Sequence, residues 1–408
     1  MRALVLSTTF PNARQPNLGI FIAERMRRVA RACDVVVVAP VPWFPFNEAI
    51  RGPRWNDVPP VEEFDGIRVL HPRIFCIPGL FKWTDGVLYA ASLVPFLSRL
   101  RKEFDFDLID SHFVYPDGLA AVLLGKIFHR PVVVTLRGSI VRLANYPLHR
   151  PQIRWALRKA TRIVSVSVAL RNVAAELGIP PARIQIIPNG VDAERFQPRD
   201  RAAARRACEL PFDRRIVLTV GGLYEHKGQH LVLQVLPELV RRYPNVLYVM
   251  VGDPVQPRDK DRLLEMIRRG DLEDHVVFAG SRLNRVLGDW YAASDVFCLP
   301  TRSEGWANVL LESLACGTPV VTTRVGGNPE IVSDERYGYL VPFQDAPALR
   351  DALVRALDTS WDRHAIARYA RAHTWEGAAD RVRAEFEQVL AAKPAAAAVA
   401  ASLGGDAR

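Results

Sequence analysis

Two glutamates, Glu304 and Glu312, stand eight residues apart in a segment whose pattern predicts a strand, a turn, a helix and a second strand. Apolar runs over 296–299 and 320–323 predict buried parallel strands, and residues 305–315 predict the helix between them. Open α/β sheets bind ligands at the carboxyl ends of their strands, where this turn lies. A carboxylate at that position can accept hydrogen bonds from sugar hydroxyls.

The predicted start of this helix is also suited to a diphosphate. The amides of residues 305–308 would lack helical partners, and the helix dipole places about half a positive charge there. Lys227 lies just before another predicted helix, over 228–242, which follows a strand over 215–220, and it could meet the same diphosphate as a point charge. The alternative is that Glu304 caps its helix while Glu312 and Lys227 are solvated.

The amino-terminal half repeats the strand-loop-helix pattern. A strand over 2–7 leads through a polar loop to Gly19 and an amphipathic helix over 20–32, whose arginines we expect on the polar face. A glycine at a helix start lets the backbone approach a phosphate, although it can equally be a simple helix start. No Gly-x-Gly-x-x-Gly motif supports a dehydrogenase.

Composition predicts a two-domain globular protein. The chain has 408 residues, 49% of them hydrophobic and 24% charged. Five scattered cysteines indicate neither disulfides nor a zinc site. No secretory signal and no membrane-spanning segment are predicted, so we expect a cytoplasmic protein. If the protein contacts a membrane, we expect it on the inner face. The net charge of +10 favours an anionic membrane or lipid-linked acceptor over nucleic acid, for which no motif is present.

Two aromatic clusters add to this expectation. Residues 43–46 are predicted to pack into the core, whereas residues 75–83 are the better candidate for a membrane or acceptor contact. Asp105-Phe106-Asp107 is formally a metal-binding triplet, but it precedes its strand and therefore points away from the expected ligand edge.

The sequence around the two glutamates resembles that of a known protein family. Ser303 to Val321, followed by Gly-Gly-Asn-Pro-Glu-Ile-Val at 326–332, closely resembles the signature of GT4-type retaining glycosyltransferases, which have the GT-B fold. The resemblance implies an α/β protein with two Rossmann-like domains facing a central cleft. It predicts domains over 1–192 and 193–372 and a helix over 373–391 that packs back on the first domain. The alanine-rich composition of the last residues separately predicts a disordered tail over 392–408.

The resemblance also implies an activity and the residues that carry it. A nucleoside-diphosphate sugar would donate its sugar to a saccharide or lipid-linked acceptor with retention, with no cofactor and no metal, in bacterial polysaccharide or glycolipid assembly. Glu304 would bind the sugar, Glu312 the ribose and Lys227 the diphosphate, while His112, in Asp-Ser-His-Phe-x-Tyr-Pro-Asp-Gly, would contact the donor sugar. His112, Lys227 and Glu304 form the catalytic set. The donor-binding set is Gly19, Arg137, Gly221, Gly222, Lys227, Gly280, Arg282, Glu304, Gly305, Trp306, Ala307, Asn308, Val309 and Glu312.

Two positions depart from the family pattern. A basic residue is usual where Gly222 stands, and an acidic residue is usual where Ile140 stands. Arg137, with Arg302 behind it, is the predicted replacement for the missing cation. These departures are compatible with a non-catalytic nucleotide-sugar-binding or assembly subunit. The sequence is also compatible with a GT-B nucleotide-sugar epimerase, and its charge with a nucleic-acid-binding protein.

Overall fold

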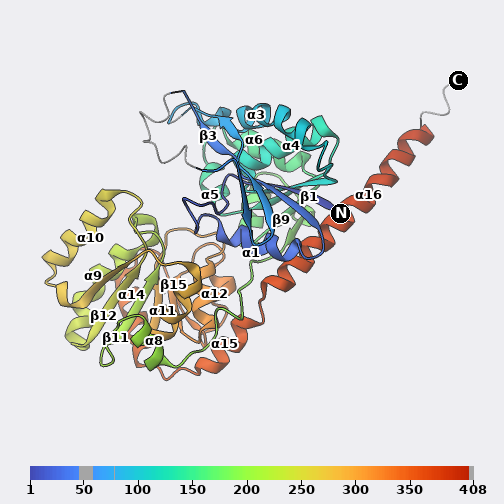
Figure 1. Ribbon diagram of the computed structural model, residues 1–408. Coiled ribbons are helices and arrows are strands. Elements are labelled where there is room, and N and C mark those ends of the chain that lie inside the picture. Colours follow the sequence, from blue (N-terminus) through green and yellow to red (C-terminus); the bar gives the residue numbers. More distant parts are fainter. Residues whose placement is uncertain (46–57, 78, 404–408) are drawn as a thin grey trace. The chain divides into compact units, whose positions relative to one another are not determined.

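The computed structural model describes residues 1–45, 58–77 and 79–403, and the chain divides into two compact units (Figure 1). Unit 1 comprises residues 1–188 together with the chain from Trp375 onward, and unit 2 comprises Asn189–Thr374. The chain thus leaves unit 1 four residues before the predicted boundary at Asp192, and returns to it in the last helix.

Unit 1 is built on a largely parallel sheet. Its described strands run in the order β10-β9-β8-β7-β1-β2-β5-β4, and only β4 is antiparallel to its neighbour. A separate pair joins β3 and β6. The strands are β1 (Arg2–Leu6), β2 (Asp34–Val38), β3 (Val41–Trp43), β4 (Val61–Phe64), β5 (Ile67–Leu70), β6 (Arg73–Phe75), β7 (Leu108–His112), β8 (Val132–Leu136), β9 (Arg162–Ser165) and β10 (Ile184–Ile186).

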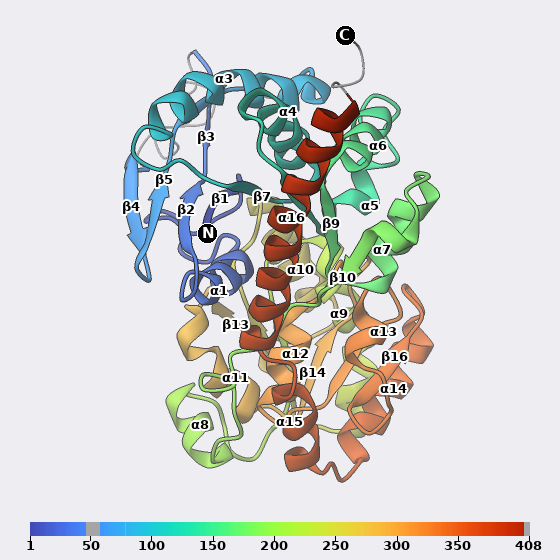
Figure 2. The same cartoon turned by 90° about the vertical axis from the view of Figure 1, so that its right-hand side faces the viewer.

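Helices cover both faces of this sheet because its strands are apolar on both sides. Ala3 and Val5 of β1 pack with α1 and α16, whereas α4 contacts β7 and β8 and packs beside α3 (Figure 2). The helices of unit 1 are α1 (Ile20–Val29), α3 (Asp85–Leu100), α4 (Leu119–Phe128), α5 (Ser139–Leu143), α6 (Arg150–Lys159), α7 (Val168–Glu176) and α16 (Trp375–Leu403), with short turns η2 (Lys82–Thr84), η3 (Val114–Gly118) and η4 (Pro181–Arg183).

Unit 2 has a fully parallel sheet with the strand order β13-β12-β11-β14-β15-β16 among its described strands. The chain starts in the middle at β11, builds outward on one side and then on the other, so the order reverses between β11 and β14. That reversal is the topological switch point of a doubly wound fold. The strands are β11 (Arg215–Val220), β12 (Val246–Val251), β13 (Val276–Gly280), β14 (Val296–Leu299), β15 (Val320–Thr323) and β16 (Gly338–Val341).

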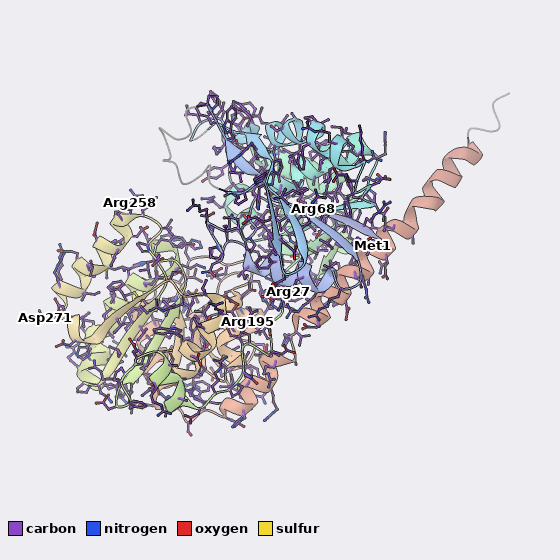
Figure 3. The ribbon with its side chains drawn as sticks, viewed as in Figure 1. Met1, Arg27, Arg68, Arg195, Arg258 and Asp271 are labelled. Atoms are coloured by element: carbon purple, nitrogen blue, oxygen red, sulfur yellow. The ribbon has the colours of Figure 1, made fainter. Side chains whose placement is uncertain are left out.

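Two helical layers enclose the sheet of unit 2. Ile216 and Leu218 pack with α11, α12 and α15 on one face, and Val217 packs with α9, α10 and α14 on the other. Arg258 and Asp271, labelled in Figure 3, mark the two ends of α10. The helices are α8 (Arg201–Ala207), α9 (Gln229–Arg242), α10 (Pro257–Arg269), α11 (Leu287–Ala293), α12 (Asn308–Ala315), α13 (Asn328–Ile331), α14 (Ala346–Asp358) and α15 (Arg363–Arg371), with turns η5 (Glu225–Lys227), η6 (Glu273–His275) and η7 (Asn284–Val286).

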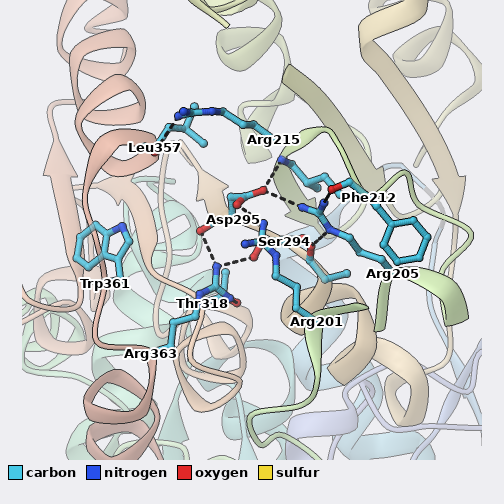
Figure 4. A network of polar contacts seen from close by, with 12 residues as sticks. Arg201, Arg205, Phe212, Arg215, Ser294, Asp295, Thr318, Leu357, Trp361 and Arg363 are labelled. Atoms are coloured by element: carbon cyan, nitrogen blue, oxygen red, sulfur yellow. Dashed lines mark hydrogen bonds and ion pairs between the residues drawn. The ribbon is translucent and has the colours of Figure 1, made fainter. Parts of the chain in front are cut away.

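A polar network anchors the start of β14 (Figure 4). The Asp295 carboxylate accepts from the Arg205 guanidinium at 3.0 Å and from the Ile216 amide at 2.7 Å, and it also pairs with Arg201. Arg363 donates to the carbonyls of Ser294 and Asp295. These bonds satisfy charges that would otherwise be costly to bury, and they fix β14 beside β11.

Four sequence expectations are wrong. Helix α12 begins at Asn308 instead of Gly305, and residues 392–403, expected to be disordered, continue α16, in keeping with the high helix propensity of alanine. Residues 404–408 lie outside the described residues. Trp43 is 41% exposed instead of buried, and Phe46 in the same cluster is not described. Arg25 and Arg28 of α1, expected on a polar face, are buried: Arg28 pairs with Glu376 of α16, and Arg25 donates to the Ile187 carbonyl at 3.4 Å.

Candidate functional site

The loops that follow β11 and β14 bring Lys227 and Glu304 together at the switch point of unit 2. Lys227 Nζ lies 2.6 Å from Glu304 Oε1, and Thr301 Oγ1 donates to the same oxygen at 3.2 Å. Both side chains are mostly covered, with 21% of Lys227 and 13% of Glu304 exposed. A cation and a carboxylate therefore sit side by side at the sheet edge where α/β folds bind ligands.

Two glycines make this approach of loops possible. Gly228 has φ 81°, and a Cβ there would lie 2.1 Å from the carbonyl oxygen of Pro300. Gly326 has φ 51°, and a Cβ there would lie 1.6 Å from the carbonyl oxygen of Glu304. Only glycine satisfies both the left-handed backbone and the missing space. The backbone of Glu304 is thus held from the β15 side, while its side chain is held by Lys227.

The Lys227–Glu304 contact also sets the charge of the lysine. Burial by itself lowers the pKa of Lys227, but the adjacent Glu304 carboxylate outweighs it, so that the pKa is raised above its ordinary value. Lys227 is therefore a cation at neutral pH, as binding a diphosphate requires.

The start of α12 has no side-chain cap. Its N-cap, Ala307, is extended and provides no side-chain hydrogen bond, so the helix does not cap its own first amides from that position. Residues 305–307 precede the helix, and Asn308 and Val309 begin it. The backbone amides at the helix start therefore lie later in the chain than the predicted residues 305–308. Asn308 Oδ1 accepts from Asn189 Nδ2 at 3.0 Å, which fixes the side chain of the first helical residue.

Glu312 lies one turn further along α12. Its Oε2 accepts a hydrogen bond from the Tyr291 hydroxyl at 2.8 Å, and Tyr291 is fully buried. Burial, followed by the neighbouring carboxylate, raises the pKa of Tyr291 well above its ordinary value, so the phenol keeps its proton and remains a donor. The bond holds the carboxylate of Glu312 in one orientation.

The other predicted donor-site residues of unit 2 occupy neighbouring strand ends. Gly221 and Gly222 follow β11, and Gly280 ends β13. Arg282, in the next loop, lies over the Trp290 ring at 5.6 Å. Trp306 is half-buried beside the core of unit 2. Arg302, a predicted replacement cation, pairs instead with Glu225 at 3.1 Å.

In unit 1 the structure brings His112 and Arg137 together. Arg137 Nη2 lies 3.0 Å from His112 Nδ1, and Asp110 Oδ2 lies 3.2 Å from His112 Nε2. Because a guanidinium can only donate, Nδ1 accepts and Nε2 carries the hydrogen. Burial lowers the pKa of His112 to about 4, although Asp110 acts in the opposite direction, so the imidazole is neutral at pH 7. Nδ1 is thus bonded inside unit 1, whereas the buried Nε2 lies near Asp110 but has no hydrogen-bond partner among the described residues.

Gly19 starts α1 in a left-handed conformation, with φ 64°. A Cβ there would lie 2.3 Å from the carbonyl oxygen of Thr9, so glycine is required. The nearby Phe21 ring supports the Arg137 guanidinium at 4.7 Å. Gly19 and Arg137 are therefore linked through α1.

Sequence reasoning missed a contact at the switch point of unit 1, where the loops after β1 and β7 meet. The Asp117 carboxylate accepts from the Thr8 amide and from the Thr8 hydroxyl. Burial raises the pKa of Asp117 to about 7, although the Thr8 bonds lower it. The Tyr-Pro-Asp-Gly motif could have indicated this contact, because an acidic residue just after a strand lies at the edge of the sheet where ligands bind.

Beside this contact unit 1 has a pocket of about 570 Å³, the polar pocket, in which charged and hydroxyl side chains stand among Phe113, Pro116 and Leu143. Its wall includes Thr8, Lys82, Asp85, Asp117, Ser139, Arg142, Tyr146 and His149. Asp105 and Asp107, by contrast, lie at the other end of β7. Asp105 pairs with Arg101 and Arg130, and Asp107 accepts from the Arg2 amide, so both acids have structural partners.

Comparison with known proteins gives matches in both halves. The family described as glycosyl transferases group 1 matches residues 200–373, and glycosyltransferase family 4 matches residues 18–195. D-inositol 3-phosphate glycosyltransferase 2 of Catenulispora acidiphila is 35% identical over 88% of this chain and 87% of its own. The GDP-mannose-dependent alpha-(1-6)-phosphatidylinositol monomannoside mannosyltransferase of Mycolicibacterium smegmatis is 29% identical over 86% of this chain and 87% of its own.

Solved structures resemble the whole fold. Sucrose-phosphate synthase from Thermosynechococcus elongatus matches with a TM-score of 0.78 at 22% identity, covering 96% of this chain and 99% of its own. HepE from Anabaena, solved in complex with UDP, matches with a TM-score of 0.73 at 19% identity, covering 95% and 100%. The GT-B fold expected from the sequence is confirmed.

The environment of Gly222 generates a first prediction. Its φ is not in the left-handed range, and a Cβ would meet only the Tyr224 and Val255 side chains at 3.4 Å, so a larger residue fits. Gly222→Arg should restore the missing cation and tighten nucleoside-diphosphate binding about tenfold. Calorimetric titration with UDP and GDP measures this, with Gly222→Ala as the control. Equal affinities of the arginine and alanine variants would contradict it.

The buried His112 generates a second prediction. Its folded pKa, about 4, lies below the ordinary 6.5. Between these values the unfolded chain binds a proton that the folded chain does not, so stability falls as pH falls. His112→Asn keeps an acceptor for Arg137 but removes this titration. From pH 7 to pH 5 the wild type should lose about 2 kcal/mol more unfolding free energy than the variant.

Urea titrations at the two pH values measure this difference. The exposed His129, changed to Asn, serves as the control because it tests loss of a histidine without the buried environment. An identical pH dependence in wild type and His112→Asn would show that His112 does not titrate as its burial requires.

Proposed function

The chain belongs to the GT4-type glycosyltransferases, and from that membership we propose a retaining, metal-independent transfer from a nucleoside-diphosphate sugar to an acceptor hydroxyl. The single observation that carries the proposal is the Lys227–Glu304 contact of 2.6 Å at the switch point of unit 2. It combines a fixed cation for a diphosphate with a carboxylate for sugar hydroxyls.

The chemistry that we propose depends on charge stabilisation. When the bond to the anomeric carbon breaks, negative charge accumulates on the departing diphosphate. Lys227 and the uncapped start of α12 carry positive charge that is already in position, so little reorganisation is needed as this charge develops. Glu304 would hold the sugar and Glu312 the ribose, which keeps the breaking bond oriented.

Unit 1 supplies the remaining residues of the proposal. Gly19, His112 and Arg137 keep the donor-side roles that the family resemblance gives them. His112 is neutral and its Nδ1 accepts from Arg137, while its Nε2 has no hydrogen-bond partner among the described residues, so contact with the donor sugar is the role that we propose for it.

The acceptor and the setting are also proposed. Two relatives are named for D-inositol 3-phosphate and for phosphatidylinositol monomannoside. We propose a saccharide or lipid-linked acceptor in polysaccharide or glycolipid assembly, with peripheral contact between unit 1 and an anionic membrane at its cytoplasmic face. Leu80, Phe81 and Trp83, which are 64%, 57% and 41% exposed, support that contact. Among the described residues, no helix is both long enough and apolar enough to cross a membrane.

Activity measurements test the proposal. Thermal shift over a panel of UDP- and GDP-sugars identifies the donor, since a ligand that binds only the folded state raises the melting temperature. Product NMR should then show the donor's anomeric configuration, and a chelator should leave the rate unchanged. Glu304→Ala and Lys227→Ala should each lower kcat about 10²- to 10³-fold.

The matched control is Glu335→Ala, which removes an exposed carboxylate paired with Arg355 elsewhere in unit 2. Inversion at the anomeric carbon, collapse of the rate with chelator, or full activity of Glu304→Ala would contradict the proposal. Donor turnover without acceptor would favour the epimerase, and donor binding without release of nucleoside diphosphate would favour the non-catalytic subunit.

A further inference from the structure

Helix α3 of unit 1 is unusually apolar on its outer side. No residue between Asp85 and Arg99 is charged. Tyr89, Leu93 and Leu97 face the core, yet the other side of the helix carries Val87, which is 52% exposed, and the exposed Ala91. An ordinary surface helix has polar residues on its outer side, so α3 has an apolar surface that the core does not use.

This surface borders an apolar groove of about 680 Å³ between α3, α4 and α6. The wall is formed mainly by Trp83, Val87, Leu88, Leu119, Leu123 and Trp155. A groove of this size lined by aliphatic and aromatic side chains suits a hydrocarbon chain.

Two of the helices that form the groove carry cations. Lys126 of α4 lies over the Trp155 ring at 4.7 Å. Helix α6 carries exposed arginines at 150, 154 and 158 and has no acidic residue. Apolar surface rimmed by positive charge matches an amphiphile with an anionic head.

The groove and the polar pocket of unit 1 are neighbours. Lys82 lines the pocket and the next residue, Trp83, lines the groove; His149 lines the pocket and Pro151 lines the groove. Gln152 Nε2 donates to the Trp83 carbonyl at 2.9 Å and ties the two walls together. The two cavities are thus separated by a short divider, and an amphiphile that lay across it would have its head in one cavity and its tail in the other.

The pocket retains one unmatched cation. Lys82 pairs with Asp85 at 2.6 Å, and Asp117 is bonded to Thr8. Arg142 has no ion-pair partner in the described part of the chain, and the buried Ser139 Oγ there has no hydrogen-bond partner. A phosphate group would supply acceptors for both.

We propose that unit 1 binds an anionic lipid, with its phosphate-type head at Arg142 and Ser139 in the polar pocket and its hydrocarbon tail in the groove of α3, α4 and α6. This inference rests on the proposed function for one point, that the bound lipid is the acceptor. Glycosyl transfer would then occur on a head group that unit 1 holds at the membrane surface, while the tail fixes its depth.

Alkyl phosphates test the proposal directly, below their critical micelle concentrations. Binding is followed through the fluorescence of Trp83 and Trp155, which line the groove. From hexyl to decyl phosphate, affinity should rise about fourfold per methylene, the increment expected for burying one CH₂. Inorganic phosphate and octyl glucoside, which lack the tail and the charge respectively, should each bind at least tenfold more weakly than octyl phosphate.

Two variants locate the head and the tail. Arg142→Gln should weaken every alkyl phosphate about tenfold and leave octyl glucoside unchanged. Val87→Glu should reduce the increment per methylene to less than twofold while leaving inorganic phosphate binding unchanged. Val61→Glu places the same charge on β4 at a residue of similar exposure, 53%, and should match the wild type.

An affinity for alkyl phosphates that does not depend on chain length would overturn the proposal. So would a gain in affinity per methylene that is unchanged in Val87→Glu, or that falls equally in Val61→Glu. Octyl glucoside binding as tightly as octyl phosphate would overturn the anionic head. These probes contain neither nucleotide nor sugar, so they report on unit 1 alone. Alkyl phosphate binding without glycosyl transfer would support this lipid site and contradict the proposed function. Glycosyl transfer without alkyl phosphate binding would support the proposed function and contradict this lipid site.

Discussion

The contact between Lys227 and Glu304 is the interaction on which the candidate site of unit 2 depends. It exists because the strand order reverses between β11 and β14, so that the loops after these strands leave the sheet side by side. Gly228 and Gly326 then allow backbones to approach where any side chain would collide. The result is a cation and a carboxylate held by the fold before any ligand binds, which is how a protein lowers the reorganisation needed during charge development.

Unit 1 uses buried charge differently. Arg25, Asp110, His112 and Arg137 lie at the centre of its sheet with almost no exposure. Burial lowers the pKa of Arg25 to about 10, with Asp110 partly opposing it, and the same burial keeps His112 neutral. Such a cluster is costly to bury, and both Asp110 carboxylate oxygens and His112 Nε2 have no hydrogen-bond partner among the described residues, so the surrounding fold has to hold these groups in place.

Much of the fold follows from local sequence. The apolar runs predict strands β11, β14 and β15 to the residue, because strands buried on both faces are continuous apolar runs. The Glu304–Glu312 spacing and the Lys227 loop can likewise be recognised as a candidate site from residue types alone. Those site roles remain predictions that the activity measurements test.

The expectations that failed depended on distant parts of the chain. Residues 305–307 look helical locally, but the approach of Gly326 to Glu304 and the extended N-cap Ala307 delay the helix to Asn308. Arg28 looks like a surface residue, yet Glu376, from the far end of the chain, pairs with it and buries it. The Thr8–Asp117 contact likewise joins residues more than one hundred positions apart.

Amide hydrogen exchange with a saturating nucleoside diphosphate tests the central claim most directly. If the diphosphate binds at Lys227 and the start of α12, peptides covering 221–229 and 303–312 should gain protection, whereas the outer helices α10 and α14 should be unchanged. Protection that appears elsewhere, with those two peptides unaffected, would contradict the account.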